Sequence, residues 1–455
     1  MTIEVEAIPA QSIADDVTLD DSQRFTEASK GHQKNNGLVL AGLALTDQAI
    51  VSVTNFLTTV LIARLCTGRE LGIYALAWTI INLVKTAQER AISAPYLVFV
   101  HRSETDAKSF LGSSLVHQMG FAMLSVVCIS LLGCFFAWRG QPHGLALALS
   151  VLAVGAPFIL LREHIRAVNS AHFRFHISLL MDASILLLQL GGILFLAYYQ
   201  RLSIATAFVM IGVSCFLPVA IWYRSARSDF RFSRKLIGTH WSNNWNYSRW
   251  LVFARTLGIA GHFLLPWIIV LFMSESAAGK FASCVTLVGL SMMFVLGANN
   301  FFQARAVRDF HEGGLRKLYG SLTTALVVFV SVLSVISTIF FLKGDWLLSM
   351  VYGPDFASYG TVVFLLSLNV LLVSITIVVG NGLSALGRSS GFLIGESAYF
   401  VVTVSTAIFF TMNWQLVGAA WSLVCGGIAG VIAQTITLGV AFSREKNREV
   451  AANRT

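Results

Sequence analysis

The first long apolar run of the chain, Gly37–Leu65, contains a single acidic residue, Asp47. A run of this length is enough to cross a bilayer, which takes about 20 residues. A charge inside such a span is costly unless it faces a protein interior or a water-filled cavity. Apolar spans with one thin polar stripe recur along the whole chain. The sequence therefore predicts an all-α, polytopic membrane protein whose helices enclose a polar interior.

The composition agrees with a membrane protein. Hydrophobic residues make up 56% of the chain and charged residues only 12%, whereas a soluble domain carries roughly 25% charged residues. The net charge of +9 could suggest nucleic acid binding. The basic residues lie between apolar spans, however, so they are better explained as topology anchors that face anionic lipid. We expect membrane lipids, and no nucleic acid, as partners.

Several kinds of site are not expected. The six cysteines are scattered and form no Cys-x-x-Cys pair, so neither a metal site nor a disulfide framework is predicted. There is no phosphate-binding G-x-x-x-x-G-K-[ST] loop and no Ser-His-Asp set. No outward loop is long enough for a catalytic domain. We therefore expect neither an enzyme nor a cofactor.

About twelve spans follow a polar N-terminal segment, by the apolar-run criterion. Residues 1–36 have no apolar period and are predicted to form a disordered cytoplasmic tail. We expect an N-terminal six-helix lobe at 37–223, a basic cytoplasmic linker at 224–246, a C-terminal six-helix lobe at 247–442 and a cytoplasmic tail at 443–455. The predicted spans lie near 37–65, 71–93, 110–138, 143–164, 176–199, 203–223, 247–272, 279–302, 321–342, 360–385, 391–411 and 415–442.

Lys and Arg residues set the expected orientation. They are frequent in one set of alternating loops and sparse in the other, and the richer set should be cytoplasmic. An even number of spans then places both termini in the cytoplasm. The richer set includes Arg102, Lys108, Arg162, Arg166, Arg174, Arg224, Arg227, Arg231, Arg234, Lys235, Arg305, Arg308, Arg316, Lys317 and Arg388.

A short internal repeat supports two similar halves. Gly72-Ile73-Tyr74-Ala75 opens the second span and Gly279-Lys280-Phe281-Ala282 opens the eighth. Both read Gly-x-aromatic-Ala after a short polar turn. Two six-helix lobes related in this way would enclose a central cavity at their interface, where transporter sites usually lie.

Polar residues at helical spacing are candidates to line that cavity. Span seven carries Ser248, Arg255 and His262, which share one helix face. Arg255 would contact substrate, form an ion pair with Asp47 or Asp182, or extend its head group to the membrane surface.

In span two, Lys85 and Glu89 can pair along one face beside Arg90, or simply mark the cytoplasmic end of a helix. Asp47 in span one, near Asn55, and Glu396 in span eleven could bind a coupling proton or Na⁺, or could neutralise a cation of the cavity. The predicted cavity residues are Asp47, Asn55, Lys85, Arg90, Arg255, His262 and Glu396.

A basic belt follows span four. It contains Arg162, Arg166 and Arg174, together with three histidines. Either it forms a cytoplasmic loading patch for an anionic lipid head group, with Arg162 and Arg166 at its centre, or it is the orientation signal alone.

Several segments resemble the polysaccharide flippases of the Wzx type, a family of the multidrug/oligosaccharidyl-lipid/polysaccharide exporter superfamily. The similar stretches are Asp47-Gln48-Ala49, Asn55-Phe56, Ala63-Arg64-Leu65, Glu70–Ala77, Tyr352–Ala357, Leu383–Arg388 and Asn413–Ala420. The resemblance covers nearly all of the chain after the tail. About twelve spans, instead of fourteen, argue against the lipid II flippase branch.

The resemblance implies a function. A flippase of this family turns a polyprenyl-diphosphate-linked oligosaccharide across the bacterial inner membrane, for surface lipopolysaccharide or exopolysaccharide biosynthesis. The resemblance also implies a polysaccharide polymerase and export proteins as possible partners. A cationic groove would supply counter-charges to the diphosphate.

Two alternatives stay open. A multidrug or cation antiporter of the same superfamily would use Asp47, Asp182 and Glu396 to hold organic cations. A non-transporting membrane scaffold would have no reason to keep several polar stripes.

Overall fold

Helices account for nearly all of the secondary structure. The computed structural model describes residues 19–100, 107–140, 142–388 and 391–452, and these ranges contain no strand. The helices are α1 (Leu19–Leu65), α2 (Gly68–Gln88), α3 (Ala94–Phe99), α4 (Ala107–Arg139), α5 (Leu145–Ala171), α6 (Phe175–Tyr198), α7 (Ile204–Ala226), α8 (Arg234–Phe272), α9 (Glu275–Tyr352), α10 (Gly360–Ala385) and α11 (Gly391–Ala452). A π-helix, η1 (Glu89–Ser93), joins α2 to α3, and two 3₁₀ turns, η2 (Arg227–Asp229) and η3 (Pro354–Phe356), follow α7 and α9.

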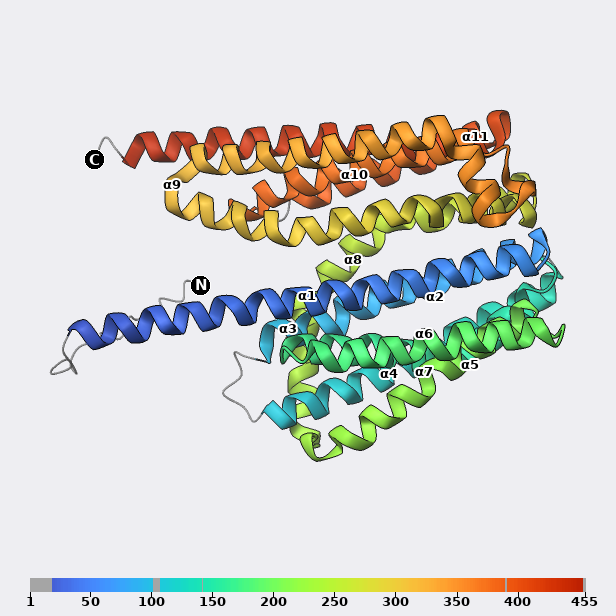
Figure 1. Cartoon of the computed structure of the whole chain (residues 1–455), viewed down its shortest axis with the longest axis horizontal. Coiled ribbons are helices and arrows are strands. Elements are labelled where there is room, and N and C mark those ends of the chain that lie inside the picture. The colour runs from blue at the N-terminus through green and yellow to red at the C-terminus, as the bar shows by residue number, and fades with distance from the viewer. Residues whose placement is uncertain (1–18, 101–106, 141, 389–390, 453–455) are drawn as a thin grey trace.

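The all-α, polytopic prediction is confirmed. Eight stretches of the described chain are long and apolar enough to cross a membrane. Two of them fold back on themselves. In α9, Gly313 and Gly314 leave helical geometry, and in α11 Gln415 adopts φ 53°. Figure 1 shows α9 running out and returning beside itself. Because α9 and α11 each supply two spans, and α2 and α8 are more polar spans, the helices match the twelve expected apolar runs.

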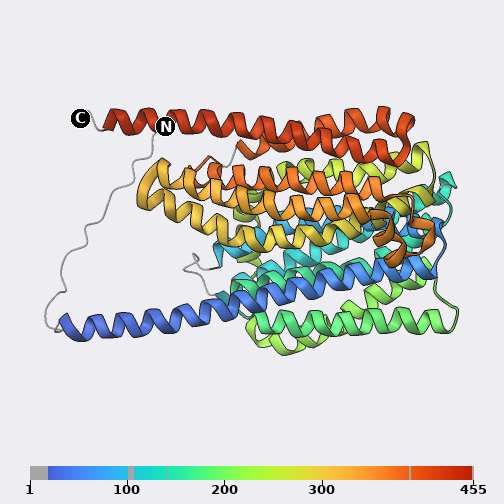
Figure 2. The same ribbon diagram turned by 45° about the horizontal axis from the view of Figure 1, so that its top comes forward.

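The helices form two groups joined by α8. In Figure 1, α1 to α7 make up the lower group and α9 to α11 the upper group, while α8 passes from one group to the other. Figure 2 shows the same long helices lying side by side, with α1 and α11 extending past their neighbours at one end. We call this the terminal end, and the opposite end the far end. One hydrophobic core draws residues from both groups, from Ile62 on α1 to Val424 on α11.

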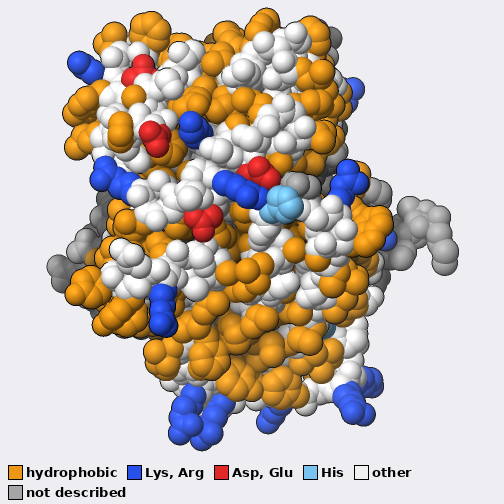
Figure 3. All heavy atoms as spheres, turned by 90° about the vertical axis from the view of Figure 1, so that its right-hand side faces the viewer, with side chains coloured by type: hydrophobic (Ala, Val, Ile, Leu, Met, Phe, Trp, Pro, Cys, Tyr) orange, Lys and Arg blue, Asp and Glu red, His pale blue; other side chains and the backbone are white. Residues whose placement is uncertain are grey.

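At the far end, α2 and α9 cross in close contact. A Cβ atom added to Gly72 would lie 1.7 Å from the backbone oxygen of Glu275, and one added to Gly279 would lie 2.7 Å from the nitrogen of Gly72. These are the two glycines of the sequence repeat, so the repeated motifs meet each other. Figure 3 looks onto this end and shows acidic, basic and apolar side chains scattered together.

Three boundaries differ from the sequence prediction. The segment predicted as a disordered tail is helical from Leu19 onward, because a helix that has already nucleated extends at little cost per residue; residues 1–18 lie outside the described ranges. The C-terminal tail is likewise helical to Ala452. In the predicted linker, α8 already begins at Arg234, and His240, Asn244 and Ser248 form a buried face along it.

Candidate functional site

Six charged side chains meet inside the first helix group, on four different helices. We call them the charge network. Their side chains are between 0% and 22% exposed. The network holds three cations and three acids, so its formal charges balance. Its members are Asp47 on α1, Lys85 on α2, Arg162, Glu163 and Arg166 on α5, and Asp182 on α6.

Arg166 is the centre of the network. Its Nη2 lies 2.8 Å from Asp47 Oδ2, its Nη1 lies 3.3 Å from Glu163 Oε2, and its Nε lies 2.9 Å from Asp182 Oδ2. One guanidinium therefore contacts three carboxylates from three helices. A planar group with several fixed donors can do this, whereas the ammonium of a lysine acts as a point charge.

Arg162 and Lys85 complete the network. Arg162 Nε lies 2.7 Å from Asp182 Oδ1, and its Nη1 lies 3.8 Å from Glu163 Oε1. Lys85 Nζ lies 2.9 Å from the same Glu163 oxygen. Burying unpaired charges is expensive, and pairing inside the protein offsets much of that cost. Each buried charge of the network has at least one partner of opposite sign.

The network forms one wall of a cavity lined by α2, η1, α3, α5 and α8. The cavity has a volume of about 630 Å³. Lys85, Glu163 and Arg166 line it, together with Arg90 of η1 and Phe263 of α8. The remaining lining residues are Asn82, Thr86, Gln88, Glu89, Ser93, Ala94, Leu97, Ala167 and Ser170.

Arg90 is the cation of the cavity with the weakest pairing. Its Nη2 lies 3.2 Å from Glu89 Oε1, but the Glu89 side chain is 60% exposed. Its Nε is buried and has no hydrogen-bond partner among the described residues. The charged residues that line the cavity are three cations, Lys85, Arg90 and Arg166, against two acids, Glu89 and Glu163. Arg166 is also balanced by Asp47 and Asp182 of the network, so Arg90 is the least compensated cation of the cavity wall.

The sequence-predicted residues are only partly brought together. Asp47, Lys85 and Arg90 lie in the network or along the cavity. Lys85 pairs with Glu163 and not with Glu89 as expected, since the π-helix begins at Glu89 and this side chain is mostly exposed. Asn55 is half-buried on α1.

Two further candidates lie on the joining helix α8 and on α11 of the second group. His262 is hydrogen-bonded through Nδ1 to the Tyr399 hydroxyl at 2.9 Å. Glu396 lies over Gly258 on α8, where an added Cβ would come within 2.3 Å of its Oε2. Arg255 is a residue of α8, but its side chain is outside the part of the chain that the structure describes. His262 immediately precedes the cavity residue Phe263.

Arg162 and Arg166 do not form an exposed patch. Span four was predicted to end near residue 164, but α5 continues to Ala171. Both arginines point into the helix group and pair with acids of α1, α5 and α6. Arg174, the third residue of the predicted belt, is exposed and lies 3.9 Å from Asp229.

Sequence reasoning missed Glu163. This residue contacts Lys85, Arg162 and Arg166. The available signal was an acid between two arginines at the end of an apolar run. Other polar stripes pair with each other between helices: Gln189 Nε2 on α6 donates to Thr58 Oγ1 on α1 at 2.7 Å. Such bonds hold helices together and contribute nothing to the cavity wall.

Comparison with known proteins identifies the fold. No family model and no curated protein matches the sequence. Among solved structures, the chain is similar to an inward-facing multidrug resistance transporter of the MATE family of the MOP superfamily, with a TM-score of 0.71 and 15% identity over 88% of this chain and 99% of that one. It is also similar to the lipid II flippase MurJ in an inward closed conformation, with a TM-score of 0.72 and 14% identity over 88% and 87% of the two chains.

A third similar structure is a MOP superfamily transporter from Pyrococcus furiosus whose binding pocket is described as having reversed polarity. Its TM-score is 0.64, with 12% identity over 90% of this chain and 96% of that one. The chain therefore shares the fold of MOP superfamily transporters across most of its length.

Proposed function

We propose that this protein is a membrane transporter that moves a polyprenyl-diphosphate-linked oligosaccharide across the inner membrane, for surface polysaccharide or exopolysaccharide biosynthesis. The observation that carries the proposal is the weakly compensated Arg90 on a cavity wall that also carries Lys85 and Arg166. A diphosphate is the charged part of such a substrate, and it needs counter-charges to enter the interior of a membrane protein.

The charge network explains how the cavity stays stable without substrate. Arg166 and Lys85 are neutralised by carboxylates of the protein itself, so neither charge is buried without a partner. A diphosphate can compete with Glu163 for these two cations. Arg90 would make the first contact, because its side chain is 31% exposed and its partner Glu89 is mostly exposed. Exchange of one anion for another would let the head group bind and leave at modest cost.

The fold supports transport by a lipid-linked route. One of the similar structures is a lipid II flippase and another is a multidrug transporter. The close crossing of α2 and α9 at the far end, together with a cavity among the other segments of α2, α5 and α8, supports a conformation in which substrate enters from the terminal end.

An organic-cation antiporter is the second candidate. The observation that favours it is the presence of three buried acids, Asp47, Glu163 and Asp182, in a MOP superfamily fold. Each of these acids already contacts an arginine, so an organic cation would have to displace a guanidinium.

Ligand binding by the purified protein separates the two candidates. We expect farnesyl diphosphate, a short prenyl diphosphate, to raise the melting temperature, and farnesol and ethidium to have no effect. Arg90→Gln should weaken the stabilisation, whereas the matched variant Arg316→Gln, on the exposed turn of α9, should not. Stabilisation by ethidium but not by farnesyl diphosphate would assign the cavity to organic cations.

A further inference from the structure

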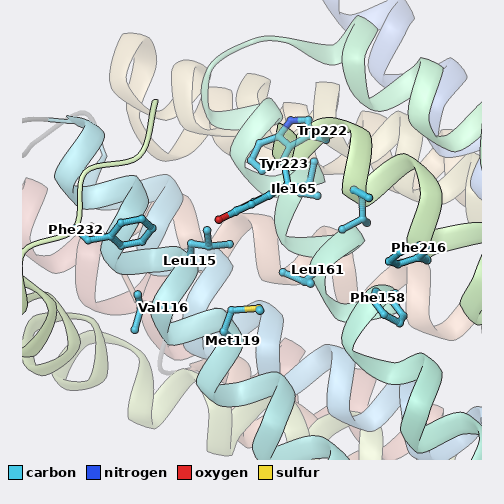
Figure 4. Close-up of a pocket in the computed structure, with 12 residues that line it drawn as sticks. Leu115, Val116, Met119, Phe158, Leu161, Ile165, Phe216, Trp222, Tyr223 and Phe232 are labelled. Atoms are coloured by element: carbon cyan, nitrogen blue, oxygen red, sulfur yellow. The ribbon is translucent and has the colours of Figure 1, made fainter. Parts of the chain in front are cut away.

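An apolar groove runs along the outer wall of the first helix group, away from the cavity. It consists of two adjoining pockets of about 360 and 430 Å³ that share Phe158 of α5 and Phe216 of α7. The rings of these residues are in edge contact, with centroids 5.0 Å apart. Figure 4 shows the first pocket, lined from α4 by Leu115, Val116 and Met119.

The groove has the length of a lipid chain. Along α5 it extends from Ile165 to Val151, which at 1.5 Å per residue is about 21 Å. One leaflet of the hydrocarbon core is about 15 Å thick, half of roughly 30 Å. At its far part, α5 and α7 meet closely at Gly155 and Gly212, where an added Cβ would lie 3.0 to 3.3 Å from the opposite backbone. This close contact forms the floor of the second pocket.

Aromatic residues surround the mouth of the groove at the terminal end. Trp222, Tyr223 and Phe232 line it, and Trp and Tyr are residues that favour the membrane–water interface. In Figure 4 the Tyr223 hydroxyl points into the pocket. It gives a polar tip to an otherwise apolar site.

A basic segment adjoins this mouth. The chain that joins α7 to α8 carries five exposed cations within twelve residues, Arg224, Arg227, Arg231, Arg234 and Lys235. Its acid, Asp229, lies 3.9 Å from Arg174.

The segment is held in place on α4. The backbone N–H of Arg231 donates to the Lys108 carbonyl at 3.1 Å, and Lys108 Nζ donates to the Ser228 carbonyl at 3.2 Å. An added Cβ on Gly112 would lie 2.3 Å from the Arg231 carbonyl oxygen. The cations are therefore displayed from a fixed backbone beside the groove.

We propose that the groove and this basic segment bind one anionic phospholipid of the leaflet at the terminal end. An acyl chain fills the groove, and the phosphate is held by cations of the segment, as expected where basic clusters meet anionic lipid. This segment connects α7 to α8 and so joins the two helix groups. A bound lipid therefore restrains the connection between the groups.

The groove is distinct from the proposed transport cavity. At 100° per residue, Leu161 and Ile165 lie on nearly the opposite face of α5 from Glu163 and Ala167, and only the latter pair lines the cavity. The isoprenoid tail of a transport substrate would be the competing occupant. The position of the groove on the wall away from the cavity favours a resident phospholipid, and this inference does not depend on the transport proposal.

Lipid binding by the full-length protein tests the inference. We would compare phosphatidylglycerol with phosphatidylcholine in mixed micelles, by native mass spectrometry and by melting temperature. The charge variant is Arg224→Gln/Arg227→Gln/Lys235→Gln. Its matched control is Arg308→Gln/Arg316→Gln/Lys317→Gln, on the exposed turn of α9 at the same end. The groove variant is Ala220→Trp, because Ala220 lines the first pocket and a larger side chain would fill it. Its control is Leu187→Trp on α6, where the Leu187 side chain is 70% exposed.

We expect the wild type to prefer phosphatidylglycerol. The charge variant should weaken that binding by on the order of 100-fold, about fivefold for each cation removed, and Ala220→Trp should abolish it, while both controls bind as the wild type does. Val116→Trp replaces Ala220→Trp if the latter does not fold. An equal loss of phosphatidylglycerol binding in the charge variant and in its matched control would show that general surface charge causes the effect, and would overturn the site. Retained binding in the groove variants, or displacement of phosphatidylglycerol by an equimolar polyprenyl phosphate, would also overturn it.

Discussion

At the scale of single residues, Arg166 joins three helices through one guanidinium. It contacts Asp47 of α1, Glu163 of α5 and Asp182 of α6. The side chain is only 19% exposed. Removal of one partner from a buried ion pair leaves an uncompensated charge, which commonly costs about 3–5 kcal/mol. The stability of the first helix group should therefore depend strongly on this residue.

We predict that Arg166→Gln lowers the free energy of unfolding by about 3–5 kcal/mol, because three acids then share the remaining cations. Arg166→Lys should recover only part of the loss, since an ammonium cannot reach all three carboxylates. Thermal melting in detergent checks both variants, with Arg174→Gln, an exposed arginine of the same predicted belt, as control. Wild-type melting of Arg166→Gln would contradict the network.

Asp47 is open to two accounts, and the contact with Arg166 favours charge balance. On that account Asp47→Asn leaves Arg166 with excess charge and lowers the melting temperature, and the double variant Asp47→Asn/Arg166→Gln recovers part of the loss, because both members of the pair are gone. If Asp47 instead carries a coupling proton, Asp47→Asn should remain stable and transport should lose its dependence on the proton gradient. Melting and gradient-driven transport, measured on the same variants, decide between the accounts.

At the scale of helices, α2 and α9 cross in close contact at the far end. The glycines of the repeated motif permit it, because a side chain at Gly72 or Gly279 would overlap the opposite backbone. Gly72→Ala should lower the free energy of unfolding by about 1–3 kcal/mol through overpacking. The control is Gly289→Ala on α9, which has open space around it and gains helix propensity. Melting of both variants tests the crossing, and a neutral Gly72→Ala would show that the helices adjust without cost.

Helix existence was predictable from the sequence, while the partners of each charge were not. Apolar length identified the spans, and the repeated Gly-x-aromatic-Ala motif marked two corresponding places without showing that they touch. The stripe on span one placed Asp47 in the interior. The sequence could not decide whether Asp47 pairs with Arg255 or with another cation, because the pairing depends on how α1, α5 and α6 pack. The extension of α5 past residue 164 was also missed, and it places Arg166 inside the helix; Arg162 already lay within the predicted span, and its pairing with Asp182 was not foreseen.

At the scale of the whole molecule, the distribution of Lys and Arg predicts the orientation. Both termini and the joint between α7 and α8 should lie in the cytoplasm. Single cysteines introduced at Ser228 in the joint and at Pro142 between α4 and α5 give a matched pair for labelling with an impermeant thiol reagent in intact cells, in a background without native cysteines. We expect labelling at residue 142 and not at residue 228; the reverse pattern would invert the orientation.

We claim that the cavity at Arg90 carries a lipid-linked diphosphate across the membrane, and flipping in proteoliposomes measures this activity. The measurement follows a fluorescent polyprenyl-diphosphate oligosaccharide as it becomes accessible on the opposite leaflet. We predict that the wild type flips it, that Arg90→Gln slows flipping about tenfold or more, as loss of a charge-assisted hydrogen bond implies, and that Arg316→Gln flips at the wild-type rate. Flipping by the wild type no faster than in protein-free liposomes, or flipping unaffected by Arg90→Gln, would contradict the claim.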